Sequence, residues 1–239
     1  MAIETIQNPT TITWLQAKQS VAATTGGQDS ANEQARAGEC LRDALLALNN
    51  KRNWKFLRRI DTQASVTSGT LTLPATLKKI YSVVISSSTA NYTRSLRFMD
   101  RRNFDREVDQ STALGGIYTY TAYNLDASGT IAIHDAPTAT TPVTVVTCYL
   151  RDVIIPPGDT DKFDLPEKVM PFVFAEAKSL YLASKQLDAS FWMRKSMEYL
   201  RDLIIEDEKE LDSNPTFSTY LAEFTPSTNW AVGYSVFQF

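Results

Sequence analysis

The spacing of hydrophobic residues changes twice along this 239-residue chain, and this change most constrains the fold. Between Ser30 and Asn50, apolar residues recur at the spacing of an amphipathic helix. From residue 56 to residue 150 they alternate in short runs separated by turn residues, which predicts β-strands. Helical spacing returns between residues 165 and 212. This order predicts an α+β fold, in which a small antiparallel β-sheet domain is inserted into a helical bundle.

The expected helices carry start and stop signals. Ser30 is placed to cap the first helix, with Glu33 completing a capping box, and Asn49 and Asn50 are expected to end it. Pro166 suits the first turn of the second helical region. That region has an apolar stripe with a break at residues 187–190, made of Phe172, Val173, Ala177, Leu180, Tyr181, Phe191, Met197, Leu200, Leu203 and Ile204. We expect this stripe to pack against the first helix.

The alternating region is expected to contain six strands, near residues 56–66, 70–73, 80–86, 117–123, 130–134 and 143–150. A charged segment at 99–109 interrupts them and predicts a short helix or a lid. The chain is thus expected to comprise an N-terminal arm (1–29), a core (30–212) and a C-terminal tail (213–239). Within the core we assign residues 30–50 to a helix, 54–151 to the β-domain and 165–212 to helices. The arm has one amphipathic piece, residues 12–21, and is either packed or loose.

The residue types that support most enzymes and metal sites are scarce. The chain has one histidine, His134, and its two cysteines, Cys40 and Cys148, lack the spacing of metal ligands. No glycine pattern of a phosphate-binding loop occurs. Four aspartates around residues 152–164 do not fit a calcium loop and are expected to form an exposed acidic loop; they are Asp152, Asp159, Asp161 and Asp164. We therefore predict no catalytic residue, no cofactor and no metal.

Charge and hydropathy limit the binding partners and the cellular compartment that we expect for the protein. The net charge is −3, so no overall positive field favours wrapping around a polyanion. The N-terminus does not read as a secretory signal, and no apolar stretch approaches the roughly 20 residues that span a bilayer. We expect a soluble protein made in a cytoplasm, with no membrane partner.

Two basic groups stand beside aromatic residues. The first comprises Lys51, Arg52, Lys55, Arg58 and Arg59 beside Trp54 and Phe56, and the second comprises Arg94, Arg97, Arg101, Arg102 and Arg106 beside Phe98 and Phe104. Such groups can bind nucleic acid, or they can face the acidic stretch 202–212 of a neighbouring subunit. We favour the second interpretation. The expected intersubunit residues are Arg58, Arg59, Arg97, Arg101, Arg102, Arg106, Glu206, Asp207 and Glu208.

A succession of short motifs resembles a known family. The run Asn53-Trp54-Lys55-Phe56-Leu57 is followed by Gly69-Thr70-Leu71-Thr72-Leu73-Pro74 and then by Lys79-Ile80-Tyr81-Ser82-Val83. Later come Ser95-Leu96, Asn103-Phe104, Ile131-Ala132-Ile133 with Ala136-Pro137, Tyr149-Leu150-Arg151 and Asp164-Leu165-Pro166. In their order and spacing these motifs are similar to phage head-to-tail adaptor proteins, also called head completion or tail accessory proteins. The resemblance covers residues 30–211.

The resemblance implies a structural role in the virion. Members form rings, usually dodecamers, that dock under the portal protein at the neck after assembly in the host cytoplasm. The β-domain then faces the next tail or nozzle protein, and genome DNA passes through the lumen without sequence-specific binding. The C-terminal segment often grips the portal. Here that segment carries seven aromatic residues, which are Phe217, Tyr220, Phe224, Trp230, Tyr234, Phe237 and Phe239.

Three alternatives stay open. The aromatic tail could fold back onto its own bundle instead of binding the portal. The protein could carry an added cell-wall hydrolase activity, for which Glu167 and Glu176 are the candidate carboxylates. It could also be a nucleic-acid-binding virion protein that uses the arginine-rich segment 94–106.

Overall fold

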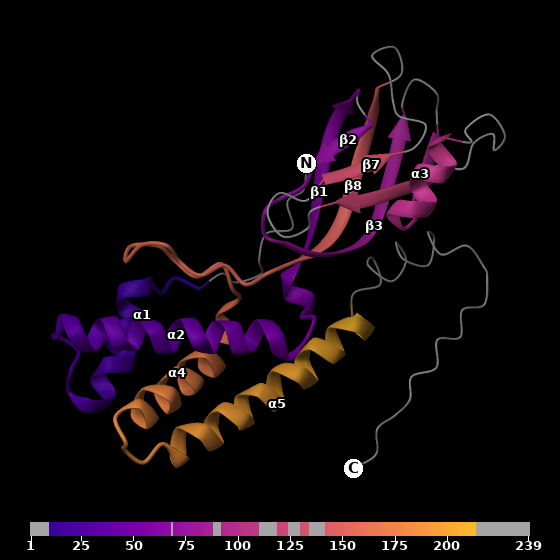
Figure 1. The fold of residues 1–239 in the computed structure, drawn as a ribbon. Helices are drawn as coiled ribbons and strands as arrows, with labels where there is room; N and C mark the ends of the chain where they lie inside the picture. The colour runs from indigo at the N-terminus through magenta and orange to yellow at the C-terminus, as the bar shows by residue number, and fades with distance from the viewer. Residues whose placement is uncertain are drawn as a thin grey trace.

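Four α-helices form the bundle predicted from the helical spacing (Figure 1). The computed structural model describes residues 10–67, 69–87, 92–109, 119–123, 130–133 and 142–213. The bundle contains α1 (Trp14–Ala22), α2 (Ala31–Lys51), α4 (Met170–Ser184) and α5 (Ser190–Ser213), with 3₁₀ turns η1 (Ala23–Thr25) and η3 (Glu167–Val169). Helix α4 packs against the other three helices. The α+β class is therefore confirmed, with helices from both ends of the core packed together.

The inserted β-domain has two four-stranded sheets instead of the single sheet that we expected. The first, in the order β1-β8-β3-β4, is antiparallel and contains β1 (Arg58–Val66), β8 (Val143–Arg151), β3 (Leu77–Ser87) and β4 (Tyr92–Ser95). The second, in the order β2-β7-β6-β5, contains β2 (Thr70–Thr72), β7 (Thr130–Ile133), β6 (Thr119–Tyr123) and β5 (Arg97–Phe98). Its β5–β6 pair is parallel. Helix α3 (Arg101–Asp109) fills the segment predicted as a helix or lid and contacts β6.

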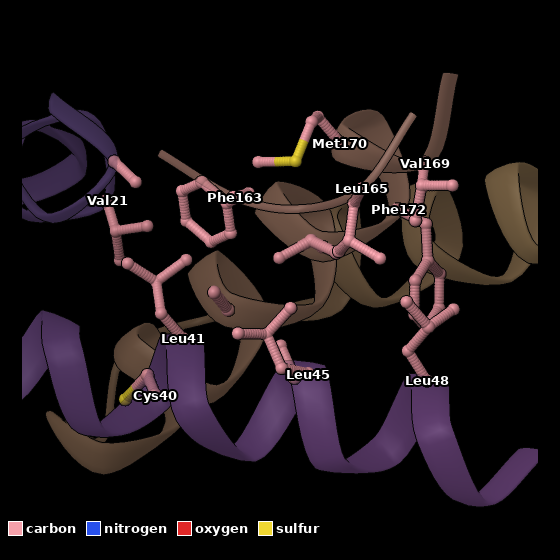
Figure 2. Close-up of a cluster of buried hydrophobic side chains, with 14 of the residues drawn as sticks. Val21, Cys40, Leu41, Leu45, Leu48, Phe163, Leu165, Val169, Met170 and Phe172 are labelled. Atoms are coloured by element: carbon pink, nitrogen blue, oxygen red, sulfur yellow. The ribbon is translucent and has the colours of Figure 1, made fainter. Parts of the chain in front are cut away.

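Each half of the molecule has its own hydrophobic core. Apolar side chains from both sheets, among them Val83, Ile85, Ile131 and Val145, share the core of the β-domain. The bundle core joins α1, α2 and α4 with the segment that precedes α4. Figure 2 shows Leu41, Leu45 and Leu48 of α2 facing Phe163, Leu165 and Phe172. The predicted helix stripe therefore meets residues more than a hundred positions away.

The described part of the N-terminal arm is packed, so the loose alternative is wrong for residues 10–29. Trp14, Ala17 and Val21 of α1 are buried against the bundle core. Thr13 and Gln16 form a reciprocal capping box at the start of α1, in which Thr13 N–H donates to the Gln16 side chain at 2.9 Å. The wide apolar ring of Trp14 supplies the burial that makes this short helix stable.

The predicted capping box of α2 is only half formed. Ser30 Oγ accepts from Glu33 N–H at 3.5 Å, but the Glu33 carboxylate turns to α4, where it accepts from the Tyr181 hydroxyl and pairs with Lys185 at 2.6 Å. The Tyr181 ring is fully buried, so its hydroxyl needs a partner at this edge of the core. Asn49 and Asn50 do not end α2, which continues to Lys51. The side chain of Asn49 instead bonds Asp152 and Val153.

The Glu33 contacts make stability depend on pH. The hydrogen bonds from Lys185 and Tyr181 lower the pKa of Glu33 below its ordinary 4.5. A lowered folded-state pKa stabilises the fold above the unfolded value, and this stabilisation is lost as pH falls through the folded value. We expect the difference in melting temperature between wild type and Glu33→Gln to be largest near neutral pH and to shrink below pH 4.5. Melting curves from pH 3 to 7 test this, and a constant difference would contradict it.

The break between α4 and α5 covers residues 185–189, so it overlaps the predicted 187–190 but begins two residues earlier, and Gln186 within it adopts a positive φ of 58°. The stripe expected to continue across α5 is partly wrong. Leu203 is buried and Leu200 and Ile204 are half-buried, but Phe191 and Met197 are 50% and 64% exposed. Among the described elements α5 packs mainly on α4, so one narrow face suffices to bury it. No helix in the described ranges is long and apolar enough to cross a membrane.

Candidate functional site

The joint between the bundle and the β-domain is built around Asn49, in the last turn of α2. Its amide nitrogen donates to Asp152 at 2.9 Å and its amide oxygen accepts from Val153 N–H at 3.3 Å. The carbonyl of Asn49 accepts from Lys78 Nζ at 2.8 Å. One residue of the bundle thus holds the start of β3 and the segment that leaves β8. These hydrogen bonds connect the end of α2 to the β-domain.

A second set of contacts joins the C-terminal part of α5 to residues 52–55, which connect α2 to β1. Asp207 is 4% exposed, and its Oδ1 accepts from Lys55 N–H at 2.9 Å. Its Oδ2 lies 3.4 Å from Arg52 Nε, while Lys55 Nζ donates to the Asp207 carbonyl. Arg52 also pairs with Glu208 at 3.1 Å. The end of α5, after which the tail begins, is therefore anchored to the segment between α2 and β1.

Arg151 closes the joint at the end of β8. The side chain of Arg151 is 8% exposed, and its Nη1 pairs with the Asp164 carboxylate. Its Nη2 donates to the Asp164 carbonyl at 2.9 Å. A buried guanidinium is stable only with such a partner. This pair fixes the loop that leads into η3 and α4.

Four residues of the first basic group make contacts within their own chain, whereas Lys51 is exposed. The intersubunit role of Arg58 and Arg59 stays a prediction. Arg52 and Lys55 bind Asp207 and Glu208 of the same chain. Trp54 is fully buried, so it cannot stack on bases. Arg58 lies 5.0 Å from the centre of the Tyr81 ring, and Arg59 donates to the Phe56 carbonyl at 2.8 Å. These contacts remove the nucleic-acid interpretation for Trp54.

The expected acidic partner surface changes as well. Asp207 is buried within its own chain, so it leaves the set of residues that can face a neighbouring copy. Glu206 and Glu208 are exposed and make surface ion pairs with Lys168 and Arg52. Their intersubunit role stays a prediction. A signal for the buried aspartate was present in the sequence, because Asp207 follows Leu203 by four positions and Leu200 by seven, on the apolar face of α5.

The second basic group is on the surface of the β-domain. Arg97, Arg101, Arg102 and Arg106 are exposed, and Arg101 Nε pairs with Asp105 one turn later at 2.7 Å. The two aromatic residues of this group differ, since Phe104 is buried and Phe98 is 59% exposed. The structure does not bring these arginines together with Arg58 and Arg59. They form a separate surface on β5 and α3.

The four aspartates predicted as an exposed acidic loop make contacts within the chain, two of them at the joint between the bundle and the β-domain and two with α1 or its neighbouring loop. Asp152 bonds Asn49, Asp164 bonds Arg151, and Asp159 pairs with Lys18 of α1 at 2.5 Å. Asp161 accepts from Gly158 N–H at 2.7 Å, and its carbonyl accepts from Trp14 N–H. Of the four, only Asp159 is exposed. Among the described residues no group of histidine, cysteine and acidic side chains could hold a metal ion.

The two carboxylates considered for cell-wall hydrolysis do not form a pair. Glu176 accepts from the buried hydroxyl of Ser196 on α5, whereas Glu167 is exposed in η3. They are nine positions apart along the helix, which is about 13 Å along the axis. Glycosidase carboxylates lie roughly 5–9.5 Å apart. This geometry gives no support to a hydrolase site at these residues.

The seven aromatic residues assigned to portal binding lie outside the described residues, as do His134 and residues 1–9. The portal assignment and the alternative of a tail folded back therefore both stay predictions.

The family model described as SU10 adaptor protein matches residues 12–218, which covers α1, both sheets and α5. No curated protein matches the chain.

Proposed function

Because the chain belongs to the SU10 adaptor protein family of phage head-to-tail adaptors, we propose that it forms a ring in the phage neck, between portal and tail. The ring extends the DNA channel, and the genome passes through without sequence-specific binding. A net charge of −3 suits such a passage, since a strongly basic lumen would retain DNA. The observation that carries the proposal is the family match across nearly the whole described chain.

The two-part architecture supports a joint role. A helical bundle and a β-domain with separate cores offer two surfaces, one for the portal and one for the next tail or nozzle protein. The contacts of Asn49, Asp207 and Arg151 connect the two halves. A component that transmits position from one ring to the next needs such a connection.

The C-terminal residues are the proposed portal anchor. The end of α5 is fixed by Asp207, and the 26 residues from 214 to 239 follow it. Fully extended, a segment of this length reaches about 86 Å. Seven aromatic side chains within it match the residue types that dominate binding hot spots.

Truncation after Asp212 tests the anchor. We expect the truncated chain to keep its melting temperature, because it retains every described element except the last residue of α5, and to lose portal affinity by at least about a hundredfold. Biolayer interferometry measures the affinity of the full-length and truncated chains for purified portal. A second variant, in which only the seven aromatic residues are replaced by serine, should lose the same affinity. Undiminished binding by either variant would exclude the tail as the anchor.

The exposed arginines of β5 and α3 are a proposed contact between copies. Arg97, Arg102 and Arg106 are solvent-accessible, as are Glu206 and Glu208 near the end of α5. Opposite charges on separate parts of one chain suit a head-to-tail contact that closes a ring. Such surface charges set register and association rate more than affinity.

A further inference from the structure

Helix α5 has an apolar and basic surface that its own chain does not cover. Met193 and Met197 are 50% and 64% exposed, one turn apart on the same face. Arg194 and Arg201 border them and are also exposed. The structure gives neither arginine an ion pair among the described residues. Methionine and arginine are both enriched at protein interfaces. We call these four residues the α5 face.

Helix α2 has an exposed counterpart, in which two carboxylates alternate with two exposed arginines, Arg36 and Arg42. Leu46 is 48% exposed, and Glu39, seven residues or about two helical turns before it, lies on the same side together with Asp43. Both carboxylates are exposed, and neither has an ion pair within the described part of the chain. Arg42 borders this surface. We call Glu39, Asp43 and Leu46 the α2 face.

The two faces lie on opposite sides of the bundle. Helix α4 packs against both α2 and α5 and lies between them (Figure 1). Each helix buries its inner side, so the exposed sides point away from α4. A single chain therefore cannot bring its own two faces together. A second copy can, because unlike surfaces on opposite sides of one subunit join head to tail.

We propose that the α5 face of one copy docks on the α2 face of the next. The exposed methionines pack around Leu46, and Arg194 and Arg201 meet Glu39 and Asp43 of the neighbour. This contact rests on the proposed ring and places its main interface in the helical bundle. The apolar centre provides affinity, and the flanking charges fix the register.

Two substitutions test the contact because each disables one face. Met197→Asp removes the α5 face and Leu46→Asp removes the α2 face, and both positions are exposed enough to keep the fold, which melting curves verify. We expect wild type to form oligomers over a concentration series in sedimentation velocity, and each variant alone to stay monomeric. An equimolar mixture of the variants should form heterodimers and nothing larger, because only one intact pair of faces remains. Variants that associate like wild type, or a mixture that stays monomeric, would overturn the proposal.

The same mixture separates the head-to-tail contact from a symmetric one. If α5 met α5, Leu46→Asp alone would associate and the mixture would contain no heterodimer. If wild type assembles only on the portal, the double variant Met197→Cys, Leu46→Cys is treated there with a short bis-maleimide. A ladder of cross-linked copies is expected, wild type with its two native cysteines is the control, and an absence of cross-links overturns the contact.

Portal binding distinguishes this inference from the adaptor function itself. A wild-type chain that forms oligomers but never binds portal would contradict the adaptor proposal and leave the contact standing. A Met197→Asp chain that occupies the portal in the wild-type number of copies would contradict the contact and leave the adaptor proposal standing.

Discussion

Replacing Trp54 with alanine is expected to lower the free energy of unfolding by about 3–5 kcal/mol. The indole is fully buried between α2 and β1 and packs on Phe56 with ring centres 5.5 Å apart. Its Nε1 donates to the Leu48 carbonyl at 2.7 Å. Leu48 is in the last turn of α2, where carbonyls have no partner within the helix. The substitution therefore opens a cavity and leaves a buried acceptor unpaired.

Trp54→Phe separates these two effects. Phenylalanine keeps most of the apolar volume but cannot donate to Leu48, so we expect a loss of about 1–3 kcal/mol. Urea unfolding monitored by circular dichroism gives both values. Equal stability of Trp54→Ala and wild type would show that the segment between bundle and β-domain does not depend on this ring.

Asp164→Ala is the second substitution with a large expected effect, on the order of 3 kcal/mol, because it leaves the Arg151 guanidinium buried without its counter-charge. The matched control is Glu206→Ala. Glu206 lies 3.7 Å from Lys168 on the surface, and both side chains are well exposed. An exposed pair of this kind contributes at most about 1 kcal/mol.

Both variants are compared in the same urea titration. If the two substitutions have equal effects, the ion pair between buried Arg151 and half-exposed Asp164 is not what holds the segment between β8 and α4. Asp164→Asn adds a further comparison, because the new amide oxygen can still accept a hydrogen bond from Arg151. Its loss of free energy of unfolding should lie between those of Asp164→Ala and Glu206→Ala.

The helices could be predicted from sequence because their signal is local. Leu41, Leu45 and Leu48 recur at helical spacing whatever they pack against, and α2 begins within one residue of its expected start. The division of the eight described strands into two sheets could not be predicted from the local spacing of hydrophobic residues. The pairing of β2 with β7 joins residues some sixty positions apart, and β5 has only two residues. Sheet order depends on such distant contacts.

On α5 the sequence prediction reversed the environments of two residues. Met197 was assigned to the core and is 64% exposed, whereas Asp207 was assigned to the surface and is 4% exposed. Hydrophobicity alone places methionine inside and aspartate outside. On α5 the burial of a residue depends on what packs against it. Helix α4 covers only one narrow face of α5. Lys55 and Arg52 provide the hydrogen bond and the counter-charge that stabilise Asp207 when it is buried. The same reason explains Glu33, whose carboxylate bonds Tyr181 and Lys185 instead of its own helix.

The insertion of the β-domain between α2 and α4 determines the order in which the chain can fold during synthesis. Helix α2 ends at residue 51, and its packing partner α4 begins at residue 170, so 118 residues separate them. At roughly 5–20 residues per second the ribosome needs about 6–24 s to add them. Throughout that interval the leucine stripe of α2 has no α4 to cover it, while the strands between them are already emerging. A nascent chain of this design depends on holding chaperones, or on early pairing of α1 with α2, until the last third of the protein has been made.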